Sequence, residues 1–204
     1  MIETTNKKLK SKKMKKFKTI LLVAVTALVS NISFAQMMDN GSMDKTVTVG
    51  GAPMYPSKNI IQNAVNSKDH TTLVAAVKAA GLVETLEGPG PFTVFAPTNE
   101  AFDKLPAGTV DNLVKPENKA TLTTILTYHV VAGKYTSMDI MKLIKDGNGT
   151  ATLTTVEGGK LWFMMKGKKI EIKDEKGGTA WITIKDVNQS NGVIHVIDSV
   201  LMPK

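Results

Sequence analysis

GPGPFTVFAPTNEAFDKLP, residues 88–106, is a Gly/Pro break followed by a short apolar strand, a turn and a helix. The strand is expected at 91–96, and Thr98 or Asn99 is expected to cap the helix, whose first turn is acidic as the helix dipole favours. The turn contains no Ser, Cys, His or Lys and no row of glycines. It therefore offers neither a nucleophile nor a phosphate-binding loop. We interpret the stretch as a structural element that holds the fold together.

Apolar periodicity predicts further helices at residues 59–67, 73–81 and 116–131, with Gly81 as the C-cap of the second. The segment LVETLEG (82–88) is interpreted as a short turn. After residue 149 the pattern changes to alternating strands: TATLTTVEG, LWFMMKG, KKIEIKD, AWITIKDV and GVIHVIDSVLM. Helices first and an antiparallel meander afterwards predict an α+β domain.

The first 35 residues are interpreted as a secretory signal peptide. A lysine-rich segment precedes the apolar run TILLVAVTALVS (19–30), which is too short to span a bilayer. Small residues then offer a cleavage site near Ala35/Gln36. We expect a secreted protein, periplasmic or extracellular, whose mature chain carries no membrane span.

The leader accounts for most of the positive charge of the sequence. It holds eight Lys and one Glu, so it carries +7 of the net charge of +8. The remainder is close to neutral and contains no arginine, which argues against a nucleic-acid partner. The chain has no cysteine, so a secreted form must be held together by its core without disulfides. We expect a single domain at residues 56–204, preceded by a Met-containing extension at 36–55.

The sequence offers little for catalysis or metal binding. Its three histidines, His70, His129 and His195, form no closely spaced ligand motif, so neither a metal site nor a cofactor is expected. His129 follows Tyr128 at the end of an amphipathic helix, where we expect a partly buried imidazole that ties the helix to a neighbouring loop. His195 lies within a predicted strand and is interpreted as a structural or surface group.

The extension is dotted with methionines, namely Met37, Met38, Met43 and Met54. Thioethers are soft ligands that suit Cu(I), so a copper-binding protein is one alternative. Flexible methionines serve equally well as an adaptable contact surface, which we favour.

Several segments together resemble the fasciclin-1 (FAS1) domain family, also known from beta-Ig-H3. PFTVFAPTNEAF (91–102) is similar to its first signature block, NGVIHVIDSVLMP (191–203) to its second, and YHVV (128–131) to its Tyr-His motif. TTLVAAVKAAGL (71–82) resembles the helix ahead of the first block. The resemblance implies the FAS1 fold, in which N-terminal helices pack on a mainly antiparallel β-sandwich or wedge formed with the C-terminal strands.

The resemblance also implies a function, that of a secreted, non-catalytic binding or adhesion module. Its partner would be a cell-surface or matrix protein or polysaccharide, or a second copy of itself. In some animal members the Tyr-His motif is assigned to integrin recognition, which makes Tyr128 and His129 candidate binding residues. The residues themselves favour a structural role for this pair.

The alternative implied by the resemblance is an envelope carrier of an apolar small molecule such as a carotenoid. A groove lined by Met54, Tyr55, Trp162 or Met164 would serve this purpose, and the same residues are the candidate surface for a partner. No enzyme activity is expected.

Overall fold

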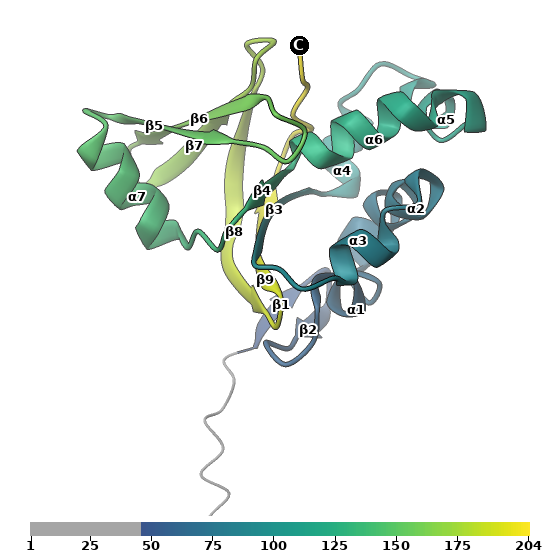
Figure 1. Ribbon diagram of the computed structural model, residues 1–204, viewed down its shortest axis with the longest axis horizontal. Coiled ribbons are helices and arrows are strands. Elements are labelled where there is room, and N and C mark those ends of the chain that lie inside the picture. The colour runs from purple at the N-terminus through teal and green to yellow at the C-terminus, as the bar shows by residue number, and fades with distance from the viewer. Residues whose placement is uncertain (1–45) are drawn as a thin grey trace, which may run out of the picture. The chain divides into compact units, whose positions relative to one another are not determined.

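The computed structural model describes residues 46–204. The expected leader, its cleavage site and Met37, Met38 and Met43 lie outside this range. The described part combines α-helices, short 3₁₀ turns and two sheets, with helices concentrated in the first half and strands in the second (Figure 1). The predicted α+β fold class is confirmed.

The helices follow the apolar periodicity of the sequence. They are α1 (Ile60–Ala64), α2 (Thr71–Ala80), α3 (Val83–Glu87), α4 (Asn99–Asp103), α5 (Thr109–Leu113), α6 (Lys119–Tyr128) and α7 (Ser137–Asp146), with 3₁₀ turns η1 (Lys68–His70) and η2 (Pro116–Asn118). Gly81 ends α2 with a positive φ of 74°, a conformation that suits glycine because it has no Cβ. Thr98 caps α4 by accepting a hydrogen bond from the backbone N–H of Ala101, as expected.

The strands form a small hairpin and a large sheet. The hairpin is β1 (Val47–Val49) with β2 (Ala52–Met54). The large sheet comprises β3 (Phe92–Pro97), β4 (Val130–Ala132), β5 (Thr150–Thr154), β6 (Lys160–Lys166), β7 (Lys169–Lys173), β8 (Thr179–Gln189) and β9 (Gly192–Ile197), in the order β4-β3-β9-β8-β7-β6-β5. Its neighbours are antiparallel except for β3 and β9, which run parallel.

The parallel pair β3 and β9 brings the two signature blocks together. Phe92 lies opposite Gly192 and Pro97 opposite Ile197, so segments about a hundred residues apart become neighbours. Both strands are buried on both faces, as is usual for strands with a parallel neighbour. The strand of the opening stretch is therefore buried between two layers of the domain, consistent with a structural role.

Two apolar cores lie on opposite sides of this central pair. Val94 and Ala96 of β3 point into a core shared with α1, α2, α3 and α6, whereas Phe95 points into a core shared with α7 and β5–β8. Figure 1 shows α1–α6 beside one half of the sheet and α7 beside β5 at the other. Alternation of side chains along β3 explains how one strand supplies both cores.

Three parts of the helix prediction were wrong. LVETLEG is not a plain turn, because Val83–Glu87 forms α3 and buries Leu86. The helix expected at 116–131 ends at Tyr128, since the next residues enter β4 and pair with β3. Helix α7 was not predicted, although Thr136 and Asp139 form a capping box at its start.

The second half of the Met-containing extension packs on the domain. Val49 and Met54 of the β1–β2 hairpin are buried in the same core as Ile60 and Leu73. The backbone N–H of Tyr55 donates to the side chain of Asn63 at 3.0 Å. The packed part of the chain thus begins before residue 56.

Candidate functional site

Tyr128 of the Tyr-His motif is fully buried, with its hydroxyl engaged on both sides. The hydroxyl donates to the carbonyl of Lys160 at 2.7 Å and accepts from the backbone N–H of Glu175 at 3.0 Å. It thereby joins the end of α6 to the start of β6 and to the turn after β7. Burial is the main cause that raises the pKa of Tyr128 to about 12, so the phenol stays neutral.

His129 is 3% exposed and connects three segments. Its Nε2 accepts from the backbone N–H of Leu201 at 3.0 Å, so Nδ1 carries the proton that is donated to the carbonyl of Ile125 at 2.8 Å. This geometry agrees with the expected tie between the helix and a neighbouring loop, although the imidazole is buried rather than partly buried as expected. Both residues of the motif are enclosed, and neither side chain is presented to a partner in this conformation.

The chain's three histidines are all buried, and each has a lowered pKa. Burial, which disfavours the charged form, is the main cause in each case and lowers the pKa of His129 to about 4. His195 donates from Nε2 to the carbonyl of Tyr135 at 2.9 Å, and its Nδ1 accepts from the backbone N–H of Asp186. These imidazoles are neutral structural groups at pH 7.

Ser137, Asp186 and His195 are close together without forming a catalytic triad. The hydroxyl of Ser137 donates to the carboxylate of Asp186 at 2.5 Å, and the same carboxylate accepts from the backbone N–H of Ser137. Both ring nitrogens of His195 are bound to backbone groups. A triad needs the histidine between the nucleophile and the acid. Here the carboxylate instead anchors the start of α7 to a bulge in β8.

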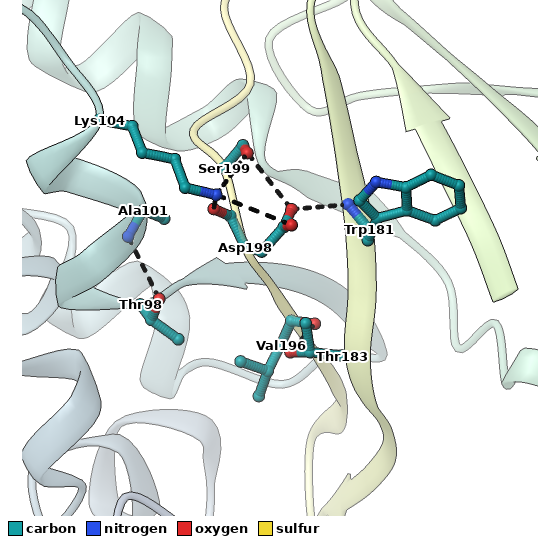
Figure 2. Close-up of polar contacts among 8 residues, drawn as sticks. All are labelled: Thr98, Ala101, Lys104, Trp181, Thr183, Val196, Asp198 and Ser199. Atoms are coloured by element: carbon teal, nitrogen blue, oxygen red, sulfur yellow. Dashed lines mark hydrogen bonds and ion pairs between the residues drawn. The ribbon is translucent and has the colours of Figure 1, made fainter.

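Asp198 of the second signature block, directly after β9, contacts Lys104 at the end of α4 and Trp181 of β8 (Figure 2). Its carboxylate accepts from the backbone N–H of Trp181 at 2.8 Å and lies 3.7 Å from the ammonium of Lys104. Lys104, at the end of α4, also donates to the backbone carbonyl of Asp198 and to the hydroxyl of Ser199. These contacts hold α4, the second block and β8 together.

An apolar hollow lies beside His129, between the helical layer and the central strands. Leu73, Val77 and Leu126 are among the side chains that line it. Its volume is about 40 Å³, which corresponds to a few water molecules at most. A larger apolar molecule would fit only if the helices moved apart.

A second, open groove lies on the outer face of the sheet and contains two of the predicted residues. Trp162 and Met164 of β6 line it together with Lys173 of β7 and the turn of residues 174–177. Its volume of about 500 Å³ lies within the range of ligand sites. The wall is mixed in chemistry, with an indole and a thioether beside ammonium and carboxylate groups.

The other two predicted groove residues lie elsewhere. Met54 is buried in the helical core, and Tyr55 is 40% exposed, with the ammonium of Lys58 at 5.1 Å from its ring centre. Neither lines the groove of Trp162 and Met164. The four residues therefore do not form one surface.

Residues 46–204 hold no group of three or more His, Cys, Asp or Glu placed to bind a metal ion. Within the same range, no helix is both long and apolar enough to cross a bilayer.

Comparison with known proteins identifies the class. The fold resembles a solved structure described as a FAS1 domain pair from the insect cell adhesion molecule fasciclin I, with a TM-score of 0.54 and 23% identity over 69% of this chain and 45% of that one. The chain is thus an α+β domain of the FAS1 type. The family model for the fasciclin domain matches residues 68–203, and the chain belongs to this family.

Several curated proteins are similar in sequence. Protein sll1483 of Synechocystis is 40% identical over 90% of this chain and 95% of its own length. Immunogenic protein MPB70 of Mycobacterium bovis is 39% identical over 69% of this chain and 66% of its own length. Transforming growth factor-beta-induced protein ig-h3 of Sus scrofa is 39% identical over 64% of this chain, and the match spans 17% of that larger protein.

The sequence did not identify Lys173 and Trp181 as residues on the outer face of the sheet, nor Asp198 as a residue that connects distant segments. The alternation in AWITIKDV places Trp181 on the opposite face from the buried residues of β8. The pairing with β7 that sets it near Trp162 depends on strand register, however, which no local pattern specifies.

Proposed function

We propose that this protein is a secreted, non-catalytic adhesion module that contacts the cell surface or extracellular matrix. The observation that carries the proposal is the contrast between the enclosed reactive groups and the open groove. Tyr128, His129 and His195 are committed to internal hydrogen bonds. The groove at Trp162 is open and lined by mixed side chains. Such a molecule is suited to contact rather than to reaction.

The fold supports the adhesion proposal. The FAS1 domain pair that it resembles comes from an insect cell adhesion molecule. The partner is a cell-surface or matrix protein or polysaccharide, or a second copy of this chain, and not a nucleic acid. Direct contact through Tyr128 and His129 would require the end of α6 to open, so the motif acts through stability.

The test is retention of the cell-envelope fraction of the producing cells on immobilised protein, with a cysteine-free, near-neutral protein of similar size as the control. Specific, saturable retention supports the proposal, and its absence contradicts it. Intact-mass measurement of exported protein tests secretion, and we expect a chain that begins at Gln36. A cytoplasmic chain that retains the leader would contradict export.

The apolar hollow beside His129 favours a second candidate function, that of a carrier of an apolar small molecule. Its present volume requires the surrounding helices to separate before a carotenoid-sized ligand can enter. An absorption band or a bound mass in native mass spectrometry of the purified protein would support this alternative. A colourless protein free of extractable apolar compounds would exclude it.

A further inference from the structure

The outer face of strands β5–β8 carries both tryptophans of the chain. Trp162 lies opposite Lys173 of β7, and Trp181 lies opposite Glu171, two positions earlier in the same strand. Buried residues alternate with them on the inner face, as in Leu161 and Ala180. The indoles therefore share one face, with about 12 Å between their Cα atoms from the spacing of strands and residues.

Polar groups surround the two indoles. Thr150, Thr152 and Thr154 of β5 are exposed on the same face, as are Thr179 and Thr183 of β8. Hydroxyl groups both donate and accept hydrogen bonds. Lys173 and Glu171 lie between the tryptophans, and neither forms an ion pair within the described range 46–204. Donors and acceptors are thus available next to each aromatic ring.

The rim of the groove is held in a fixed geometry. The carboxylate of Asp174 accepts from the backbone N–H groups of Gly178 and Met202 at 2.6 and 3.0 Å. The carboxylate of Glu175 accepts from the backbone N–H groups of Lys160 and Lys204. Asp174 is buried, whereas Glu175 is partly exposed and has further lone pairs that can accept a hydrogen bond from a ligand. Acceptors fixed in advance lose little entropy when a ligand binds.

The charges beside the indoles balance, because Lys173 and Lys176 are matched by Glu171 and Glu175. Further exposed lysines lie toward the ends of the strands, namely Lys160, Lys166, Lys169 and Lys185. Balanced charge next to the rings gives little local attraction to a strongly anionic polymer or an anionic membrane. The centre of a protein–protein interface is usually depleted of charged residues. The centre of this face instead carries charged side chains between the tryptophans, so a protein partner fits it less well. A sugar chain has apolar ring faces for the indoles and hydroxyl groups for the charged and threonine side chains.

We propose that the Trp162–Trp181 face binds an uncharged polysaccharide, with a sugar ring stacked on each indole. This inference rests on the proposed contact function and names its partner class. Trp162 and Met164 line the groove, and Trp181 adds a second aromatic side chain on the other side of β7.

Tryptophan fluorescence is a direct probe, because both emitting residues lie on the proposed face. The full-length chain is titrated with hydroxyethyl cellulose and with dextran, and retardation in gels containing each polymer gives the affinity. We expect a change in emission with at least one polymer. Trp162→Ala and Trp181→Ala should each weaken binding roughly tenfold, the factor that about 1.4 kcal/mol supplies. Trp162→Phe keeps an aromatic face and should lose less.

Tyr55→Ala is the matched control, since it removes a half-exposed aromatic ring away from this face and should leave binding unchanged. Thermal unfolding of each variant confirms that the fold is retained. The inference is overturned if neither polymer binds, if the tryptophan variants bind like wild type, or if only dextran sulfate or phosphatidylglycerol vesicles bind.

The envelope-retention test separates this inference from the proposed function. Retention by the double variant Trp162→Ala/Trp181→Ala would overturn the polysaccharide face and leave the contact function standing. Polymer binding without envelope retention would support the face and contradict the contact function.

Discussion

The ring Nε2 of His129 accepts a hydrogen bond from the backbone N–H of Leu201 at 3.0 Å, across 72 positions of the chain. The opposite nitrogen is bound to the carbonyl of Ile125. The imidazole therefore links α6 to the C-terminal end of the second signature block. A connection of this kind gives the Tyr-His motif a role in stability that needs no external partner.

His129→Ala should lower the free energy of unfolding by about 1–3 kcal/mol, because the enclosed N–H of Leu201 loses its acceptor. Urea unfolding measures the change. His129→Gln is the control and should lose less, since its amide offers both a donor and an acceptor. If the alanine variant unfolds like wild type and yet no longer retains the cell-envelope fraction, the motif is a recognition site instead.

Acid should destabilise the protein through its histidines. The pKa of His129 is about 4 in the folded chain against 6.5 for an exposed imidazole, so below pH 6.5 the unfolded state binds more protons. The contribution of His129 is therefore complete above pH 6.5 and is lost progressively toward pH 4. The lowered pKa values of His70 and His195 act in the same direction.

The measurement for this prediction is the free energy of unfolding at pH 7 and pH 5. Wild type should be less stable at pH 5, and the difference should shrink in His129→Gln, which has no titrating ring at this position. An equal pH dependence in both proteins would contradict the assignment.

Local sequence was sufficient to predict those elements of the fold that are determined by residues close to them in the chain. Caps at Thr98 and Gly81, and the alternating strands after residue 149, depend on neighbours within a few positions. The end of α6 could not be predicted in the same way. Val130 and Val131 continue the apolar pattern of the helix, but they form β4 because β3 is present to pair with them.

The candidate site was predictable only in part, for the same reason. Trp162 and Met164 were recognised as a candidate surface, and they do line one groove. Their neighbour Trp181 enters through the pairing of β7 with β8. Met54 was expected on that surface, but burial in the hairpin β1–β2 depends on packing against the helical core. Strand register for Trp181 and packing between distant segments for Met54, rather than residue type, decided these two outcomes.

Tyr128→Phe should destabilise the domain by about 1–3 kcal/mol, since the N–H of Glu175 loses its acceptor and the carbonyl of Lys160 its donor. Tyr55→Phe is the matched control and should change stability by less than about 0.5 kcal/mol, as an exposed substitution. Thermal and urea unfolding compare the two variants. Equal stabilities would show that the buried hydroxyl contributes nothing.

Asp198 and Lys104 should differ in importance although they form one ion pair. The side chain of Lys104 is 55% exposed, so Lys104→Ala should cost no more than about 1 kcal/mol. Asp198→Ala should cost about 1–3 kcal/mol, because the backbone N–H of Trp181 loses its acceptor. A double-mutant cycle by urea unfolding measures both. A larger loss for the lysine variant would contradict this ranking.

Truncation of the Met-containing extension should separate its two halves. Deletion of residues 36–44 should leave the free energy of unfolding nearly unchanged, because the core residues of the extension, Val49 and Met54, are retained. Deletion of residues 36–55 removes both and should cost roughly 3–6 kcal/mol, at about 1.5–3 kcal/mol for each buried side chain. Urea unfolding of the two truncated chains is the measurement, and equal stabilities would contradict the packing of the hairpin.

The same truncations decide between a contact surface and a copper site. If Met37, Met38 and Met43 form an adaptable contact surface, deletion of residues 36–44 should weaken envelope retention without affecting any metal. If they ligate Cu(I), the intact chain should take up the ion stoichiometrically and the deletion should abolish uptake, with Cu(I) preferred over Zn(II). We expect calorimetric titration with Cu(I) under reducing conditions to give no saturable site tighter than about micromolar, or roughly −8 kcal/mol. A tight one-to-one isotherm that the deletion abolishes would refute the contact-surface interpretation, because the deleted methionines would then be the ligands of the ion.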